Sequence, residues 1–144
     1  MKTLIDENHI VVDKIAKDWI EAVKIAGKPL VDDGYIEEEY IEDMIKNVEK
    51  NGPYMVLTDY FALLHARPGK HVNKIGMSLY VSDKLIDFKG KDVKIFLVLA
   101  STDNDSHIEY LKRIVEIFSN SDSFKIILNG NKEEILEELK KGSE

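Results

Sequence analysis

The sequence predicts a single α/β domain in which a mixed β-sheet lies between helices. Apolar residues recur every three or four positions near both ends of the chain, as on one face of a helix. Residues 74–81 alternate between polar and apolar, as in a half-buried strand, and residues 93–100 are almost continuously apolar, as in a central strand. The 144 residues are enough to bury one core without disulfides or metals.

Two helices are expected in the first third of the chain. The first spans residues 9–26 and ends at the Gly-Lys-Pro of 27–29. Its apolar face contains Val12, Ile15, Trp19, Val23 and Ala26, and we expect it to bury Trp19. The second helix has an apolar stripe over residues 36–48 and stops at the Asn-Gly-Pro of 51–53. Acidic residues cover its outer side, and we interpret them as a solvated face near the helix N-terminus.

The middle of the chain is expected to supply the strands. Two apolar runs, 54–57 and 61–64, are separated by a short polar break. After the strand at 74–81, residues 82–91 read as a polar connection to the central strand at 93–100.

The last third is expected to be mainly helical. One helix has an inner face of Ile108, Leu111, Val115 and Phe118, and its N-cap candidates are Asp103, Asp105 and Ser106. Residues 124–128 fit either a strand or a short helix. Asn131 and Glu134 resemble a capping box at the start of a final helix.

Composition narrows the class of protein. The 20 basic and 27 acidic residues leave a net charge of −7, which argues against a nucleic-acid binder. The chain has no cysteine, so it has neither disulfides nor a thiol nucleophile, which suits a reducing cytoplasm. No apolar run approaches the length needed to span a membrane. We therefore expect a cytoplasmic protein without direct membrane insertion.

The stretch at residues 61–68 is the best candidate for chemistry. An apolar run ends at His65, Arg67 follows two residues later, and Pro68-Gly69 interrupts regular structure. This pattern predicts an imidazole at the edge between a strand and a loop. His107 lies in a second polar turn, after the central strand, and is the natural candidate to face His65.

These side chains suit the transfer of a phosphoryl group. Imidazole titrates near neutrality, so a neutral ring is available to attack phosphorus and is still a reasonable leaving group. Fixed cations and hydrogen-bond donors stabilise the charged transition state. Arg67 offers a planar fork of donors, His107 one more, and the amides at the start of the following helix favour an anion.

The motifs resemble those of a known family, the IIA components of the bacterial phosphoenolpyruvate-dependent sugar phosphotransferase system, mannitol/fructose class. Residues 62–65, Ala-Leu-Leu-His, resemble the family's Ala-Leu-Pro-His, whose histidine is phosphorylated. The ascorbate branch is most similar, because it also carries Gly-Pro-Tyr, His-Ala-Arg-Pro and Asp-Asn-Asp-Ser-His, found here at 52–54, 65–68 and 103–107. The resemblance covers nearly the whole chain, from about Asp13 to the last helix.

The resemblance implies one phosphocarrier domain over residues 1–144, with no cofactor. By this resemblance His65 is expected to accept a phosphoryl group from the phosphocarrier HPr and to pass it to a cysteine of a IIB component, which serves the transporter IIC. His107 is expected to be the second histidine of the site, which hydrogen-bonds the phosphoryl group or the His65 ring and is not itself phosphorylated. Arg67 is assigned on geometry and charge alone. Ungapped counting puts Glu49 where the mannitol and fructose branches have an assisting arginine, so that role is not carried over.

Two departures from the family pattern leave an alternative open. Leu64 stands where the family usually has proline, and Asp59-Tyr60-Phe61 replaces a smaller, glycine-containing stretch. Restoring proline at Leu64 is expected to be neutral or better for stability. The departures are also compatible with a regulatory protein of the same fold, whose phosphorylation state controls a partner. A metal-dependent hydrolase using His71, His107 and Asp103 is weaker, because zinc ligands usually cluster at regular spacing.

Overall fold

The computed structural model describes residues 5–103 and 108–141, and it confirms the predicted mixed sheet between helices. The first half contains the 3-10 helix η1 (Glu7–His9), β1 (Ile10–Val12), α1 (Trp19–Asp32), α2 (Glu38–Asn51), β2 (Val56–Thr58) and β3 (Tyr60–Leu64). The second half contains β4 (Gly76–Phe88), β5 (Lys91–Ala100), α3 (Ile108–Ser119), α4 (Ser121–Asn129) and α5 (Lys132–Lys141). No helix in these ranges is long and apolar enough to cross a membrane.

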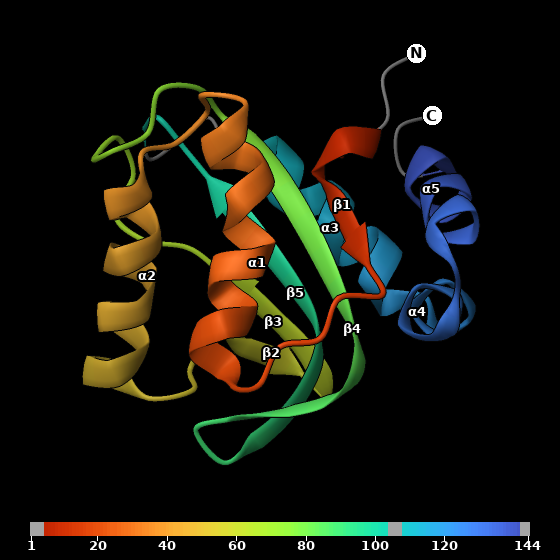
Figure 1. The fold of residues 1–144 in the computed structure, drawn as a ribbon. Coiled ribbons are helices and arrows are strands. Elements are labelled where there is room, and N and C mark those ends of the chain that lie inside the picture. Colours follow the sequence, from red (N-terminus) through yellow and green to blue (C-terminus); the bar gives the residue numbers. More distant parts are fainter. Residues whose placement is uncertain (1–4, 104–107, 142–144) are drawn as a thin grey trace.

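The five strands lie in the order β1-β4-β5-β3-β2, so β5 is central as predicted (Figure 1). β1 is parallel to β4 and β3 is parallel to β5, whereas β4–β5 and β2–β3 are antiparallel. β3 and β5 are paired as far as Leu64 and Val98. Both strands therefore run toward the same edge of the sheet. His65, the residue after Leu64, lies at that edge.

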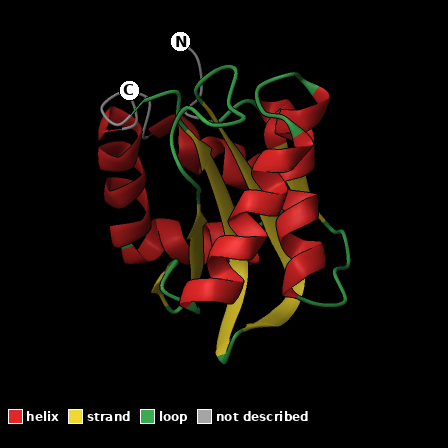
Figure 2. Cartoon of the chain, turned by 90° about the vertical axis from the view of Figure 1, so that its left-hand side faces the viewer, coloured by secondary structure: helices red, strands yellow, loops and turns green. Residues whose placement is uncertain are grey.

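Helices cover both faces of the sheet (Figure 2). One apolar cluster joins α1 and α2 to alternate strand residues such as Leu64, Tyr80 and Phe96. The other joins α3, α4 and α5 to the intervening residues, such as Leu63, Leu79 and Leu97. Successive strand side chains point to opposite faces, so a strand covered on both sides needs the continuous apolar run seen in β5.

The predicted first helix is wrong at both ends. Residues 10–12 form strand β1, and Ile15, expected on the buried face, is 73% exposed. The helix begins at Trp19, because Asp18 caps it by accepting a hydrogen bond from the Glu21 amide (2.9 Å). Trp19 itself is half-buried and packs its ring edge against Phe88.

The helix also continues past the expected stop, through Pro29 to Asp32. A proline inside a helix removes one amide donor and crowds the carbonyls of the preceding turn. Here the Ser78 hydroxyl of β4 donates to the Ala26 carbonyl in that turn, and Leu30 is completely buried. Packing against the sheet thus outweighs the local preference to stop.

β4 is longer than predicted, because it continues through Phe88 instead of ending at Val81. The residues interpreted as a polar connection form the arms of a hairpin with β5, interrupted by an irregularity between Val81 and Ile86. The turn is Lys89-Gly90, and both residues have positive φ (54° and 100°), as in the tight turns that suit hairpins. The arms are polar because much of the hairpin is exposed.

The remaining helices are mostly as expected. α2 keeps its predicted stripe and ends at Gly52, whose φ is 78°. Residues 124–128, left undecided by the sequence, belong to α4, and Asn131 with Glu134 forms the predicted capping box of α5. The inner face of α3 is rotated: Ile114, Ile117 and Phe118 are buried. The predicted inner residues Ile108 and Val115 are 47% and 55% exposed.

Candidate active site

His65 directly follows β3, at the sheet edge toward which the parallel strands β3 and β5 both run. The residues after β5 lie next to it, because the Gly69 amide of the His65 loop donates to the Ser101 carbonyl (2.8 Å). Gly69 has φ of 83°, and an added Cβ would lie 3.0 Å from the Thr102 oxygen. The loop that carries His65 is therefore packed closely on the segment that follows β5.

The His65 ring is half-buried, and its Nδ1 lies 3.1 Å from the Leu63 carbonyl oxygen. A carbonyl only accepts hydrogen bonds, so Nδ1 is the nitrogen that carries the hydrogen. In the neutral ring Nε2 then holds the free lone pair. The Leu63 amide is meanwhile bound to the Met55 carbonyl (2.9 Å), which fixes the acceptor within the sheet.

Tyr40 of α2 supports the loop from the buried side. Its hydroxyl donates to the Leu99 carbonyl (2.9 Å) and accepts from the Ala66 amide (3.0 Å), so it joins the end of β5 to the residue after His65. Burial raises the pKa of the Tyr40 phenol to about 12, and the nearby Asp43 carboxylate acts in the same direction. The phenol therefore remains protonated at neutral pH.

Tyr54 packs against the imidazole. Its ring stands edge-on to the His65 ring, with centroids 6.2 Å apart and planes at 84°. Asn47 of α2 donates to the Tyr54 hydroxyl (2.9 Å), and Asn51 donates in turn to Asn47 (2.6 Å). Tyr54 is nevertheless 50% exposed, so it remains accessible to a partner.

A small cavity of about 120 Å³ lies beside the imidazole. Its lining residues come from α2, α3 and the ends of β3 and β5: Tyr40, Leu63, His65, Ala66, Pro68, Leu99, Ser101 and Leu111. The wall is mainly apolar, and its size suits a small group, not a sugar bound next to the ring.

The other predicted site residues have different outcomes. Arg67 is exposed, two residues from His65, and has no ion pair with a described residue. His107, together with Asp105 and Ser106 of its turn, lies outside the described residues. In residues 5–103 and 108–141, no three His, Cys, Asp or Glu side chains are grouped to hold a metal ion.

The two remaining histidines are paired with carboxylates. His71 Nδ1 donates to Asp43 Oδ2 (2.9 Å), which ties the His65 loop to α2. His9 is buried and its Nε2 donates to Asp33 Oδ2 (2.6 Å), which ties η1 to the end of α1.

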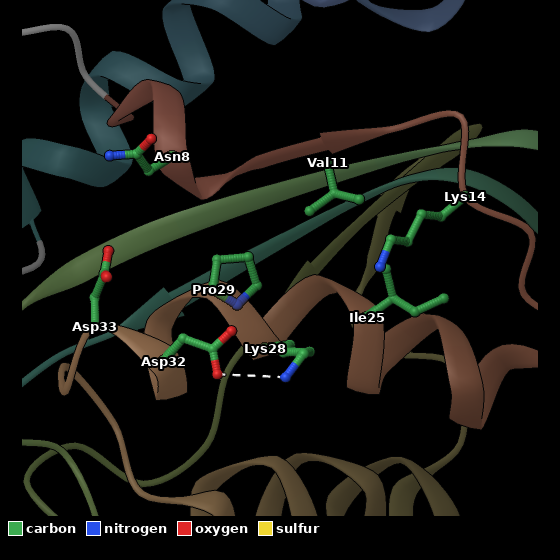
Figure 3. Close-up of a pocket in the computed structure, with 8 residues that line it drawn as sticks. All are labelled: Asn8, Val11, Lys14, Ile25, Lys28, Pro29, Asp32 and Asp33. Atoms are coloured by element: carbon green, nitrogen blue, oxygen red, sulfur yellow. Dashed lines mark hydrogen bonds and ion pairs between the residues drawn. The ribbon is translucent and has the colours of Figure 1, made fainter.

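A larger hollow of about 290 Å³ lies elsewhere, between the η1–β1 segment and α1 (Figure 3). Lys28 is paired there with Asp32 (3.3 Å), and Lys14 lies on the opposite wall. The hollow includes none of the predicted site residues, and its cations and carboxylates are mixed.

Tyr40 and Tyr54 belong to the site, but the sequence does not predict them as site residues. Tyr40 fits the apolar stripe of the second helix, and nothing local marks its hydroxyl as a link between two strand ends. Tyr54 had a signal, because it belongs to the Gly-Pro-Tyr motif at 52–54, but the motif itself names no role.

The fold and the site together define a class of protein: an α/β domain that presents one imidazole, with a free Nε2, at the end of a parallel strand. Residues 3–142 match the family described as "Phosphoenolpyruvate-dependent sugar phosphotransferase system, EIIA 2". The chain belongs to this family, whose members are phosphoryl carriers.

Individual relatives agree with this placement. The chain is 33% identical over 135 residues to the mannitol-specific cryptic phosphotransferase enzyme IIA component of Escherichia coli K12, covering 92% of each. The solution structure of that mannitol-specific cryptic enzyme IIA superposes with a TM-score of 0.89 at 30% identity and covers 96% of both chains. The chain is also 33% identical to the ascorbate-specific EIIA component of Salmonella choleraesuis SC-B67, over 85% of this chain and 82% of the relative.

More distant chains share the fold. One is the enzyme IIA for mannitol from Escherichia coli, solved in complex with its phosphorylated enzyme IIB. It has a TM-score of 0.78 at 20% identity, covering 92% of this chain and 94% of that one.

Proposed function

We propose that the chain is a cytoplasmic single-domain carrier that accepts a phosphoryl group from HPr on His65 Nε2 and passes it to a IIB component. The observation that carries this proposal is the hydrogen bond from His65 Nδ1 to the Leu63 carbonyl (3.1 Å). It orients the ring and leaves Nε2 with the lone pair without adding a charge next to the nucleophile.

The transfer is a pair of displacements on phosphorus. His65 Nε2 attacks the phosphorus of the donor's phosphohistidine, a new P–N bond forms, and the donor's P–N bond breaks to release its imidazole. Nδ1 keeps its hydrogen bond to the backbone, so the ring carries positive charge until the group leaves again. The acceptor thiolate of IIB then attacks phosphorus, an S–P bond forms, and the P–N bond to His65 breaks.

Two further side chains are proposed to stabilise the phosphoryl oxygens. Arg67 is exposed and has no ion pair with a described residue, so its guanidinium is available to an incoming anion. His107 follows from the family resemblance of the turn at 103–107. We expect His107→Ala to leave the fold intact and to slow transfer or change the lifetime of phospho-His65.

The surface around His65 supports a protein partner. Leu111 of α3 lines the cavity, and Ile108 and Val115 continue the same apolar side of this helix while being about half exposed. Tyr54 adds an exposed aromatic ring in contact with His65. Apolar and aromatic groups around a reactive centre are typical of the core of a protein–protein interface. IIC would be served only indirectly, through IIB.

We propose ascorbate-type sugar uptake for the substrate system. The support comes from the three motifs at 52–54, 65–68 and 103–107, which resemble the ascorbate branch. Relatives named for mannitol and for ascorbate are equally similar in identity, at 33%. The carrier itself does not contact the sugar.

The donor is tested by reconstitution. Phosphoenolpyruvate, enzyme I and HPr should phosphorylate the wild-type protein once, with the acid-labile and alkali-stable behaviour of phosphohistidine. His65→Ala should take up no label, whereas the matched variant His71→Ala should be labelled fully. Labelling of His65→Ala at the wild-type level would refute the proposal.

The acceptor is tested with the labelled protein. A IIB component of the ascorbate type should remove the label faster than a IIB component of the mannitol type. A protein that is labelled by HPr but transfers to neither IIB would instead support the regulatory alternative.

A further inference from the structure

We infer that Tyr40 is a positioning residue for phosphoryl transfer, because its hydroxyl hydrogen-bonds the backbone of Ala66, directly after His65, and of Leu99 in β5. We call this pair of hydrogen bonds the Tyr40 clamp. The inference rests on the proposed function of His65 and concerns how its ring is held.

The Tyr40 clamp lies directly beyond the last paired residues of β3 and β5. β3 and β5 are paired up to Leu64 and Val98, and beyond that pair the Tyr40 hydroxyl bridges the Ala66 amide (3.0 Å) and the Leu99 carbonyl (2.9 Å). Ala66 and Leu99 are both buried, so no bulk solvent replaces these bonds if the hydroxyl is removed. The phenol thus acts as a side-chain extension of the β3–β5 pairing.

His65 is therefore held on both sides. On one side its Nδ1 donates to Leu63, whose own amide is bound to Met55. On the other side the next peptide group, the Ala66 amide, is bound to Tyr40, which is 1% exposed. Tyr40 also lines the cavity beside the imidazole, so loss of its hydroxyl changes the loop and the cavity together. Phosphoryl transfer depends on placing Nε2 in line with phosphorus, and small displacements lower the rate strongly.

The Tyr40 phenol can make both hydrogen bonds at neutral pH because it keeps its proton. Its pKa is raised to about 12 by burial, so it remains both a donor and an acceptor. A phenylalanine would fill nearly the same space but offer neither function.

The test uses Tyr40→Phe with Tyr80→Phe as a matched control. Tyr80 is a second fully buried tyrosine in the same apolar cluster, and its hydroxyl donates to the Lys14 carbonyl (2.5 Å), away from the His65 loop. Both variants lose a phenol–carbonyl hydrogen bond, and Tyr80→Phe also loses a contact with the Ala16 backbone, but only Tyr40→Phe releases the Ala66 amide next to His65. Two quantities are measured: the single-turnover rate of phosphorylation by phospho-HPr, and the His65 tautomer by ¹⁵N NMR of the ring.

We expect Tyr40→Phe to lower the single-turnover rate about 10- to 100-fold and to mix the Nε2–H tautomer into the His65 signal. Tyr80→Phe should change neither quantity. Equal rates and equal tautomer populations in Tyr40→Phe and wild type would overturn the inference, whatever the loss of stability.

Two further readouts separate the possible failures. If the wild-type protein takes no label from phospho-HPr, the proposed function fails, while the tautomer measurement still tests the clamp. If Tyr40→Phe does not fold, hydrogen exchange in the wild-type protein decides: the Ala66 amide should be strongly protected, and exchange as fast as that of an exposed loop amide would overturn the inference.

Discussion

His65 begins the loop of residues 65–75 between β3 and β4, His71 lies in the second half of this loop, and the two imidazoles are held differently. His65 Nδ1 donates to a backbone carbonyl, that of Leu63 (3.1 Å). His71 Nδ1 donates to a carboxylate, that of Asp43 (2.9 Å). The same ring nitrogen is used in both, but only the second partner carries a full charge.

The difference separates a reactive ring from a structural one. A carbonyl orients the ring and selects its tautomer, yet leaves the approach to Nε2 free of negative charge. A carboxylate next to the ring places a negative charge there, which repels an incoming phosphoryl group. The His65 end of the loop is therefore suited to accept a phosphoryl group, and the His71 end to attach the loop to α2.

The largest effect is expected at the reactive end, from Arg67. Arg67→Ala should slow phosphorylation of His65 by about 100-fold, because a cation near the transferring oxygens is lost. Arg67→Lys keeps the charge but not the planar fork, so its phosphorylation rate should lie between those of the wild type and Arg67→Ala. Lys70→Ala, which removes an exposed cation from the same loop, is the control and should change the rate little. Equal rates for both alanine variants would reduce Arg67 to a solvated loop residue.

The next effect concerns Leu64, directly before His65. The structure argues against the expectation that Leu64→Pro is neutral, because Leu64 is a completely buried strand residue in the core shared with α1 and α2. Losing that side chain should lower the free energy of unfolding by at least about 2 kcal/mol, because a buried leucine also leaves a cavity. Urea unfolding of Leu64→Pro and Leu64→Ala measures it. A much larger loss for proline than for alanine would show that the Leu64 amide is also needed.

At the structural end, Asp43→Asn should have a smaller effect. It weakens the contact with His71, and since both side chains are partly exposed we expect a loss of about 1 kcal/mol in the free energy of unfolding. Phosphorylation of His65 should continue at nearly the wild-type rate. A strong loss of labelling in Asp43→Asn would contradict the separation between the two ends of the loop.

The smallest effect is the pH dependence of stability that comes from Tyr40, whose hydroxyl accepts a hydrogen bond from the Ala66 amide in the same loop. The folded-state pKa of Tyr40 is raised from 10.0 to about 12. The unfolded chain therefore loses this proton first as the pH rises, and the contribution to stability, complete below pH 10, falls between pH 10 and 12. At about pH 10.5 the loss should be about 0.8 kcal/mol. Urea unfolding below pH 10 and at about pH 10.5 should show a smaller decline in Tyr40→Phe than in wild type.

Much of the fold followed from local patterns. Residues 93–100 were identified as a central strand because their apolar run is continuous, and α2 because its stripe and its Gly52 stop agree. β1 and the start of α1 were misassigned because Val12, Ile15 and Trp19 happen to follow a helical spacing. The Asp18–Glu21 cap, a local signal, would have placed the helix start correctly.

The sequence by itself determined that the domain is α/β, that His65 stands at a strand end, and that its motifs resemble those of a phosphoryl carrier. These are local features, set by residue spacing and turn chemistry. Only the tertiary structure decided which His65 nitrogen is free, that Tyr40 joins Ala66 to Leu99, and that His71 belongs to Asp43. Each of these contacts joins a side chain to a group placed by packing, and all but the His65–Leu63 bond join residues more than 20 positions apart. Spacing along the chain carries no information about the long-range contacts of Tyr40 and His71, because their geometry exists only once the helices have packed on the sheet.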